Sequence, residues 1–315
     1  MKITVLDGDT LGKDLDLLKL NLVGEAEIFG STSLSELSER IKDTEVIIVN
    51  KLPLNSETLK GADKLKLICV AATGYDNIDT KYCAEVGVQV SNVVGYSTNS
   101  VAQVTVATVL ELATHMREYN NAVISEKYTD SGLANMVAPI FYELTGKTWG
   151  IVGLGNIGKK VADIAKAFGC RVIAHKRTPE EGYECVSLET LCRESDIISI
   201  HTPLTPATRS LIGKDEIALM KKNVILYNAA RGAVTDEAAV AEAVLSGNIG
   251  AFGSDVFSEE PLTRDNPIFK IAKLKNVCLT PHMAWASSEA RNLCLDEMIE
   301  NIKAFEKGVR RNAVN

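Results

Sequence analysis

The 315-residue sequence predicts an α/β fold with two doubly wound parallel-sheet domains. Short apolar runs, typical of strands buried on both faces, alternate with segments of helical periodicity along most of the chain. Polar or turn-forming residues follow many of these runs, at the end of a parallel strand where ligand-binding loops lie. The length indicates about two domains, at roughly 150 residues for each.

The first hundred residues have the pattern of a small parallel α/β domain. Apolar runs predict strands at 3–6, 26–29, 46–49, 65–71 and 88–91, and helical patterns lie between them at 33–41, 56–61 and 79–86. Ser33 and Glu36 have the spacing of a capping box, which marks a helix start. Two loops, 50–53 and 72–76, follow strands and are therefore candidates for ligand binding.

A long, largely apolar helix is predicted from Ser100 to about Glu118, with Asn99 or Ser100 as its N-cap. A helix that is apolar on most sides is buried, between domains or between subunits. Residues 120–144 follow without a regular pattern and are too many for a simple connection. We interpret them as an arm at an interface.

Residues 147–177, KTWGIVGLGNIGKKVADIAKAFGCRVIAHKR, predict a strand, a glycine-rich turn, a helix that ends before Gly169, and a second strand. Three glycines in the order G-x-G-x-x-G allow a tight turn, close approach of a phosphate, and packing of helix on strand. The helix N-terminus offers N–H groups and a positive dipole end to an anion. The unit therefore predicts a Rossmann dinucleotide-binding domain, with turn contacts from Gly153, Gly155, Asn156, Ile157 and Gly158.

Lys176 stands at the end of the second strand, where an NAD site has Asp or Glu to bind the ribose hydroxyls. Lys176 and Arg177 would instead attract the 2′-phosphate of NADP(H), and about 1.4 kcal/mol suffices for a tenfold preference. The alternative is a solvated basic turn with NAD(H) bound through other contacts, and Glu180 and Glu181 act in its favour. We favour NADP(H).

Further strands are predicted at 196–201, 223–227, 249–252 and 277–279, and a helix at 287–307. Polar groups suited to hydride transfer follow three of these strands. Arg231 can hold a carboxylate in a bidentate fork, and His282 can give a proton to a carbonyl oxygen. Glu260, hydrogen-bonded to that imidazole, would orient it and favour its charged form. Taken singly, each residue is equally compatible with a surface ion pair or a turn.

Five motifs of the second half, together with ATGYDNID at 72–79, resemble the D-isomer-specific 2-hydroxyacid dehydrogenases over nearly the whole chain. They are GLGNIG (153–158), HTPLTPATRSLIG (201–213), NAARGAVTDEAAV (228–240), SDVFSEEPL (254–262) and TPHMAWAS (280–287). The resemblance implies a flavodoxin-like substrate domain built from residues 1–98 and 286–315. The Rossmann domain, residues 99–285, is inserted in it, and members of the family have their active site in the cleft between the two.

The resemblance also implies roles for individual residues. Arg231 matches the active-site arginine, Glu260 the acid partner and His282 the general acid/base. Backbone amides of Thr73 and Gly74 receive the substrate carboxylate in the family. Asp255 matches the contact to the nicotinamide amide, and Thr202, Pro203 and Thr208 match contacts on the adenosine side. We add Ala229 to the cofactor contacts. Trp285 is either a lid over the substrate or a core aromatic.

Within the family, YSTNSVAQ (96–103) and HMAWAS are most similar to glycerate dehydrogenases, also called hydroxypyruvate reductases. The predicted reaction is therefore the reduction of a small 2-oxo acid, of the hydroxypyruvate or glyoxylate type, to the D-2-hydroxy acid. Pyruvate and branched-chain oxo acids are alternative substrates. Another alternative is a dinucleotide-sensing interaction protein without turnover, since corepressors share this fold. Asn50-Lys51-Leu52 departs from the Arg-Ser-x-Thr loop common in the family.

Composition restricts the partners. A net charge of −7 argues against nucleic acid as a partner, and the longest uncharged run, 86–110, contains too many polar residues to span a membrane. The N-terminus has no apolar signal core, and seven cysteines without C-x-x-C indicate reduced thiols, so we expect a cytoplasmic protein. No metal site is predicted. By resemblance we expect a homodimer.

Overall fold

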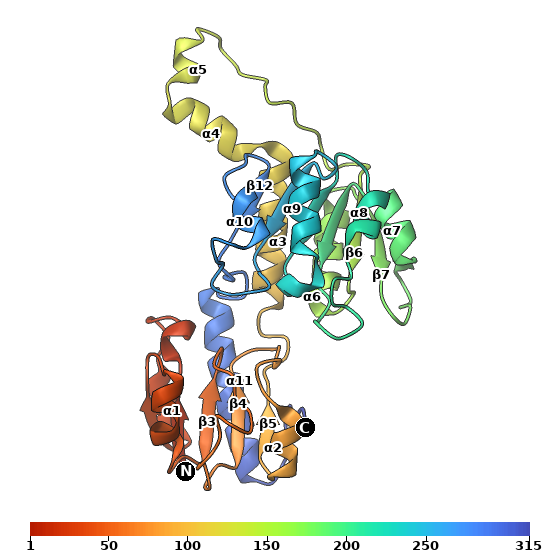
Figure 1. Cartoon of the computed structure of the whole chain (residues 1–315). Coiled ribbons are helices and arrows are strands. Elements are labelled where there is room, and N and C mark those ends of the chain that lie inside the picture. The colour runs from red at the N-terminus through yellow and green to blue at the C-terminus, as the bar shows by residue number, and fades with distance from the viewer. The chain divides into compact units, whose positions relative to one another are not determined.

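The computed structural model describes residues 1–315. The chain divides into two compact units (Figure 1). The terminal unit comprises Met1–Ser97 and Ala286–Asn315, and the central unit comprises Thr98–Trp285. Each unit has one sheet, and every strand pairing within the two sheets is parallel. The predicted fold class, two parallel α/β units, is confirmed.

The terminal unit has a five-stranded sheet in the order β2-β1-β3-β4-β5, a doubly wound order of the flavodoxin type. Its strands are β1 (Lys2–Val5), β2 (Glu25–Ile28), β3 (Val46–Val49), β4 (Leu67–Val70) and β5 (Gln89–Ser91). Its helices are α1 (Leu34–Ile41), α2 (Thr80–Glu85) and α11 (Ser288–Glu306), with short 3₁₀ turns η1 (Gly8–Leu11) and η2 (Leu17–Leu22). All four residues of β3 and of β4 are buried, because helices cover both faces of the sheet.

One predicted helix of the terminal unit is wrong. Residues 56–61 form turns, and no helix is present there. The side chain of Asn55 accepts the amides of Glu57 (2.9 Å) and Thr58 (3.1 Å), which starts a turn in place of a continuing helix. Gly61, with φ of +82°, then reverses the chain after a single turn.

The central unit has a seven-stranded sheet in the order β12-β11-β10-β9-β6-β7-β8. Its strands are β6 (Thr148–Val152), β7 (Arg171–His175), β8 (Glu184–Cys185), β9 (Ile197–Ile200), β10 (Ile225–Asn228), β11 (Ala251–Ser254) and β12 (Val277–Leu279). Its sheet helices are α3 (Thr98–Thr114), α6 (Asn156–Ala167), α7 (Leu188–Glu194), α8 (Lys214–Leu219), α9 (Glu237–Leu245) and α10 (Pro267–Ile271), with a 3₁₀ turn η3 (Gly232–Val234). The strand order reverses between β6 and β9, as in a Rossmann sheet.

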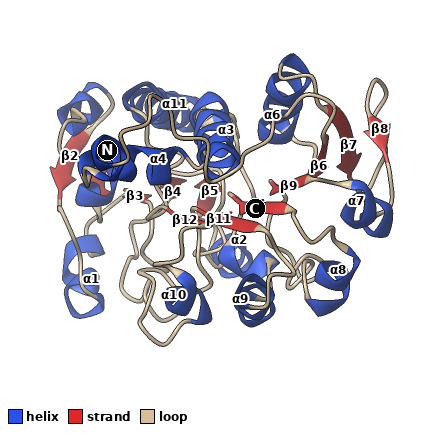
Figure 2. Cartoon of the chain, turned by 90° about the horizontal axis from the view of Figure 1, so that it is seen from above, coloured by secondary structure: helices blue, strands red, loops and turns tan.

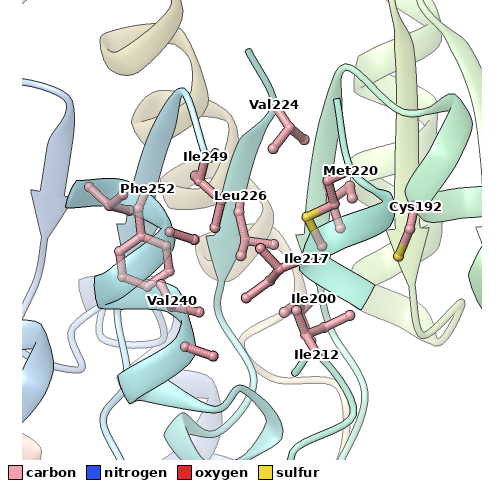
Figure 3. Close-up of a cluster of buried hydrophobic side chains, with 14 of the residues drawn as sticks. Cys192, Ile200, Ile212, Ile217, Met220, Val224, Leu226, Val240, Ile249 and Phe252 are labelled. Atoms are coloured by element: carbon pink, nitrogen blue, oxygen red, sulfur yellow. The ribbon is translucent and has the colours of Figure 1, made fainter. Parts of the chain in front are cut away.

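Helices cover both faces of this sheet, with α3 and α6 on one face and α8 and α9 on the other (Figure 2). Neighbouring residues of β10 divide between the two cores, because side chains of a strand alternate in direction. Leu226 joins a cluster with Ile217 of α8 and Val240 of α9 (Figure 3). Tyr227 packs with Trp149 on the other face. Each fully buried side chain contributes about 1.5–3 kcal/mol to stability.

The helix predicted from Ser100 to Glu118 is interrupted. It forms α3 and then α4 (Met116–Ile124), and His115 between them has φ of +54°, outside the helical region. Residues 120–144, predicted to be irregular, complete α4 and form the short α5 (Lys127–Asp130) before the chain becomes irregular. We call residues 116–144 the arm; Figure 1 shows α4 and α5 extending beyond the sheet of the central unit.

None of the helices combines the length and the apolar character that crossing a membrane requires. All seven cysteines are free thiols. Burial raises the pKa of Cys69 to about 12, so this thiol is an inert core group. Cys278, in β12, is only partly buried.

Candidate active site

The three predicted catalytic side chains follow adjacent strands of the central unit. Arg231 comes after β10, Glu260 after β11 and His282 after β12. These strands are parallel and directly paired, β10 with β11 and β11 with β12. Their carboxyl ends therefore meet at one edge of the sheet, which is the edge where α/β proteins bind ligands.

His282 and Glu260 are in direct contact. The Nδ1 atom of His282 lies 2.6 Å from Oε2 of Glu260, and both side chains are largely buried, with 21% and 29% exposed. The other carboxylate oxygen accepts the amide of Phe257 at 3.0 Å, which fixes its orientation. Because an ionised carboxylate only accepts hydrogen bonds, Nδ1 carries the proton of this pair.

Asp255 holds the loop that carries His282. Its carboxylate is buried and accepts the hydroxyl of Thr280 (2.6 Å) and the amides of Met283 and Ala284 (both 2.9 Å). Burial raises the pKa of Asp255, and the hydrogen bond from Thr280 opposes that rise. His282 itself has φ of +52°, a backbone conformation that costs a non-glycine residue about 1–3 kcal/mol. The Asp255 carboxylate thus maintains a strained backbone at the centre of the site.

The sequence pattern gives no sign of this use of Asp255, for which the family resemblance implies a contact to the nicotinamide amide. No residue spacing shows that one carboxylate will collect two amides from a loop beyond the next strand. The contact to the nicotinamide remains a prediction. In the structure, three donors occupy the carboxylate.

The loop of Arg231 lies against the loop of Glu260. The side chain of Asn228 shapes the first loop, because it accepts the amide of Ala230 (3.0 Å) and donates to the carbonyl of Arg231 (3.0 Å). Gly232 then comes so close to the second loop that a Cβ atom on it would lie 1.9 Å from the carbonyl carbon of Phe257. Only glycine permits this approach, so Gly232 brings the arginine loop onto the segment that orients Glu260.

Glu237, at the start of α9, ties the same two loops together. It accepts the amide of Ser258 (2.7 Å) and the side-chain amide of Asn266 (2.7 Å), and it also binds the hydroxyl of Ser258. This role of Glu237 cannot be predicted from the sequence, because an acid in the first turn of a helix is already explained by the helix dipole.

The three glycines of the predicted cofactor turn have the three roles that the motif assigns. Gly153 has φ of +97°, and a Cβ atom there would lie 2.6 Å from the amide nitrogen of Thr202. A Cβ atom on Gly158 would lie 2.2 Å from the carbonyl oxygen of Gly153, so this glycine lets α6 pack on the turn. A Cβ atom on Gly155 would have nothing within 4 Å. The second glycine therefore borders open space, as a phosphate cradle requires.

α6 begins within this glycine motif, at Asn156, with Gly155 as its N-cap and no side-chain cap. The first N–H groups of a helix have no intrahelical acceptor, so those of Asn156, Ile157 and Gly158 can bind an anion. The residues present fit the pyrophosphate of a dinucleotide.

The cations predicted to select NADP(H) have an internal partner. Glu180 forms ion pairs with Lys176, which follows β7, and with Lys159, which lies in α6. Hydrogen bonds from Lys159 and then Lys176 lower the pKa of Glu180. Arg177 is exposed and has no ion-pair partner. The role of Lys159 cannot be predicted from the sequence, because its place in the helix pattern gives no sign that its side chain reaches the loop after β7.

The segment after β9 has a compact turn. The hydroxyl of Thr208 donates to the carbonyl of Pro203 (2.7 Å) and accepts the amide of Thr205 (2.7 Å), so it shapes the turn. Thr202 borders Gly153, as described above, and Ala229 follows β10 on the same edge of the sheet. Their predicted contacts to the cofactor remain predictions.

The other three histidines differ from one another in their contacts. Both ring nitrogens of His201 are buried without a hydrogen bond, and burial lowers the pKa of His201 to about 3, so its ring is neutral. His175 contacts the carbonyl of Val186 through Nδ1 (3.2 Å), and His115 pairs with Glu118 in the arm. No group of three or more His, Cys, Asp or Glu side chains is arranged to hold a metal ion.

In the terminal unit, Thr73 and Gly74 follow β4. The hydroxyl of Thr73 donates to the carbonyl of Val93 (2.8 Å), and the side chain of Asn92 donates to the carbonyl of Thr73 (2.7 Å). No hydrogen bond from the two backbone amides is present, so both are available as donors. Trp285, the last residue of the central unit, is half-buried.

Residues 50–52 of the terminal unit replace the Arg-Ser-x-Thr loop that is common in the family. The buried carboxylate of Asp7 fixes this loop, and no sequence pattern indicates that contact. Asp7 accepts the amides of Asn50 (2.9 Å), Lys51 (2.6 Å) and Leu52 (3.2 Å). The side chain of Asn77 donates to the carbonyl of Leu52 at 2.9 Å. This loop and the Thr73–Gly74 turn follow adjacent strands, β3 and β4.

Comparison with known proteins gives consistent matches. Residues 106–284 match the family described as D-isomer specific 2-hydroxyacid dehydrogenase, NAD binding domain. The chain is 37% identical to a glycerate dehydrogenase from Methylorubrum extorquens, covering 99% of this chain and 98% of that protein. It is 36% identical to a hydroxypyruvate reductase from Blautia hydrogenotrophica, covering 100% of both. Among solved structures, an acyclic imino acid reductase in complex with NADPH and D-Arg is similar over 100% of both chains, with a TM-score of 0.89 and 31% identity.

Proposed function

The chain belongs to the D-isomer-specific 2-hydroxyacid dehydrogenases, and from that premise we propose that it reduces hydroxypyruvate or glyoxylate to the D-2-hydroxy acid. It is an oxidoreductase of small 2-oxo acids that uses a nicotinamide cofactor. The names of its glycerate dehydrogenase and hydroxypyruvate reductase relatives support the choice of substrate.

The contact between His282 and Glu260 carries the proposal. When bound, the nicotinamide supplies the hydride that reduces the 2-carbon of the oxo acid. Protonated His282 donates from Nε2 to the carbonyl oxygen, while Glu260 stabilises the charge on the ring. The reverse reaction uses the same pair, with neutral His282 as the base.

Arg231 and the amides of Thr73 and Gly74 are proposed to hold the substrate carboxylate, with Trp285 as a further contact. A guanidinium fork matches the two oxygens of a carboxylate and fixes its plane. Fixing that plane also fixes the neighbouring carbonyl relative to the proton donor, which is how positioning residues accelerate a reaction.

For the cofactor, we propose that the turn 153–158 and the start of α6 bind the pyrophosphate. Thr202, Pro203, Thr208, Ala229 and Asp255 contribute the remaining contacts. We propose NADP(H) over NAD(H), because Lys159, Lys176 and Arg177 place three cations around one loop. The NADPH bound in the imino acid reductase supports this choice for a chain of the same fold. NAD(H) is the alternative.

A homodimer in the cytoplasm completes the proposal. The arm, residues 116–144, exposes a set of large apolar side chains: Met116, Val123, Ile124, Leu133, Val137, Ile140, Phe141 and Tyr142. Tyr119, Met136, Val137, Ile140 and Phe141 surround a cavity of about 340 Å³, which an apolar side chain of a second copy could fill. Free thiols support a reducing compartment.

A substrate panel tests the proposed reaction. Initial rates should be measured for hydroxypyruvate, glyoxylate, pyruvate and a branched-chain oxo acid, each with NADPH and with NADH. We expect the highest kcat/KM for hydroxypyruvate or glyoxylate with NADPH. Preference for pyruvate or the branched-chain acid would refute the substrate assignment. Tight cofactor binding with no turnover of any acid would instead support a sensing protein.

A further inference from the structure

The loop after β7 contains an unusual arrangement of charge. Glu180 is held by two lysines from different elements, Lys159 of α6 and Lys176 after β7. Lys159 is the fourth residue of α6, close to the positive end of the helix dipole, where a cation is disfavoured. An anion beside it offsets this cost. The carboxylate of Glu180 is that anion, and no backbone amide donates to it.

The two lysines connect both parts of the cofactor turn. Lys159 follows Gly158, the last glycine of the turn, and Lys176 stands where a ribose-binding acid is found in NAD sites. A 2′-phosphate at that place would bring an anion to the cations that Glu180 now neutralises. The carboxylate and the phosphate are therefore alternative partners for the same pair of lysines.

We propose that Glu180 is a specificity-determining residue of the cofactor site, an internal anion that competes with the 2′-phosphate of NADP(H) for Lys159 and Lys176. This inference rests on the proposed binding of a nicotinamide dinucleotide. NADPH must displace Glu180 from both lysines before its phosphate binds them. NADH has no such phosphate and binds with the ion pairs intact. Glu180 thus weakens the binding of NADPH but not that of NADH. It therefore limits the preference of the enzyme for NADPH over NADH.

Replacement of Glu180 by Gln tests the competition, because it removes the charge and keeps the size. Glu181→Gln is the matched control: it removes the same charge one residue away, at an exposed side chain without an ion pair. Binding of NADPH and of NADH to each purified variant can be followed by nicotinamide fluorescence. We expect Glu180→Gln to increase the affinity for NADPH by roughly three- to tenfold, as the loss of two partly exposed ion pairs allows. The affinity for NADH should change by less than about twofold.

Two further measurements identify the partners. Lys159→Gln and Lys176→Gln should each lower the affinity for NADPH more than the affinity for NADH, because each removes a cation that binds the 2′-phosphate. The difference in NADPH affinity between the wild type and Glu180→Gln should become smaller at high salt, since exposed charges are screened. Equal effects of Glu180→Gln and Glu181→Gln, or equal effects on NADPH and NADH, would overturn the inference.

The same variants separate this inference from the proposed reaction. If Glu180→Gln increases the affinity for NADPH alone while no oxo acid is turned over, the proposed reaction is wrong and the proposed competition is supported. If hydroxypyruvate is reduced but Glu180→Gln affects both cofactors alike, the reaction stands and the competition is wrong.

Discussion

At the proposed active site, side chains and loop amides fix one another's positions through hydrogen bonds. Glu260 orients His282, an amide of the same loop orients Glu260, and Asp255 holds the backbone on which His282 lies. The chemistry thus requires few reacting groups and many supporting hydrogen bonds. Rates should therefore respond to substitutions that never touch the substrate.

Asp255→Asn tests this at the residue that supports the His282 loop. Asn retains one oxygen acceptor but presents an NH₂ group to a backbone amide that now donates to a carboxylate oxygen. We expect kcat to fall by about tenfold or more, because small misplacements of a proton donor are costly. Steady-state rates and circular dichroism on the same preparation would check this. Unchanged kcat in a folded variant would contradict the positioning role.

Arg231→Lys tests the carboxylate fork. Lysine keeps the charge but loses the two parallel N–H donors, so we expect KM for the oxo acid to rise by about tenfold with a smaller effect on kcat. Arg209→Lys, at an exposed position of the central unit, is the control. A KM equal to that of the control would exclude Arg231 as the carboxylate ligand.

At the scale of elements, the glycines at the start of α6 serve different purposes: Gly158 is needed for the fold, and Gly155 for binding of the cofactor. A Cβ atom on Gly158 would collide with the carbonyl of Gly153, whereas one on Gly155 would enter open space. Gly158→Ala should therefore destabilise the fold by about 1–3 kcal/mol, as overpacking does. Gly155→Ala should keep the stability of the wild type and weaken cofactor binding by about tenfold, because the methyl group occupies the phosphate cradle.

Thermal denaturation and cofactor titration of both variants measure these two effects. The interpretation of the turn would be wrong if Gly155→Ala bound the cofactor as tightly as the wild type. A Gly158→Ala variant as stable as the wild type would show that the helix can move away from the strand at no cost.

The elements that follow from local chemistry are the ones that the sequence predicts well. The apolar runs of β3, β4 and β9, the capping box of α1 and the stop at Gly169 are all present. Residues 56–61 are different, because an Asn55 side chain competes for the amides that would begin a helix. The ion pair between Lys159 and Glu180 joins α6 to the loop after β7, and no local pattern contains such a contact.

At the scale of the whole molecule, the order of the chain explains why the motifs are dispersed. The terminal unit is built from both ends, and the central unit is one continuous segment. His282 lies three residues before the chain leaves that segment, after Trp285. The proposed site residues therefore occur near the carboxyl end of many strands and in no single stretch.

The exposed apolar arm makes association between copies testable. Val137 and Ile140 are 76% and 69% exposed, and lysine at both positions should dissociate the proposed dimer, because charges at an apolar interface lose their hydration. Leu22→Lys is the control, since Leu22 is 76% exposed but lies in the terminal unit. Light scattering would report the mass. A wild-type mass of one chain, or no change in the double variant, would exclude the arm as the interface.

Hydroxypyruvate-dependent oxidation of NADPH by the wild type, His282→Ala and His115→Asn tests the assignment of the active site. We expect His282→Ala to lose most of kcat, about 100-fold or more, because the proton donor is absent. Its folding and its affinity for NADPH should remain. His115→Asn removes the histidine that precedes the arm, at a backbone conformation that Asn tolerates, and should keep wild-type turnover. Equal turnover by His282→Ala and the wild type would contradict the assignment of the active site.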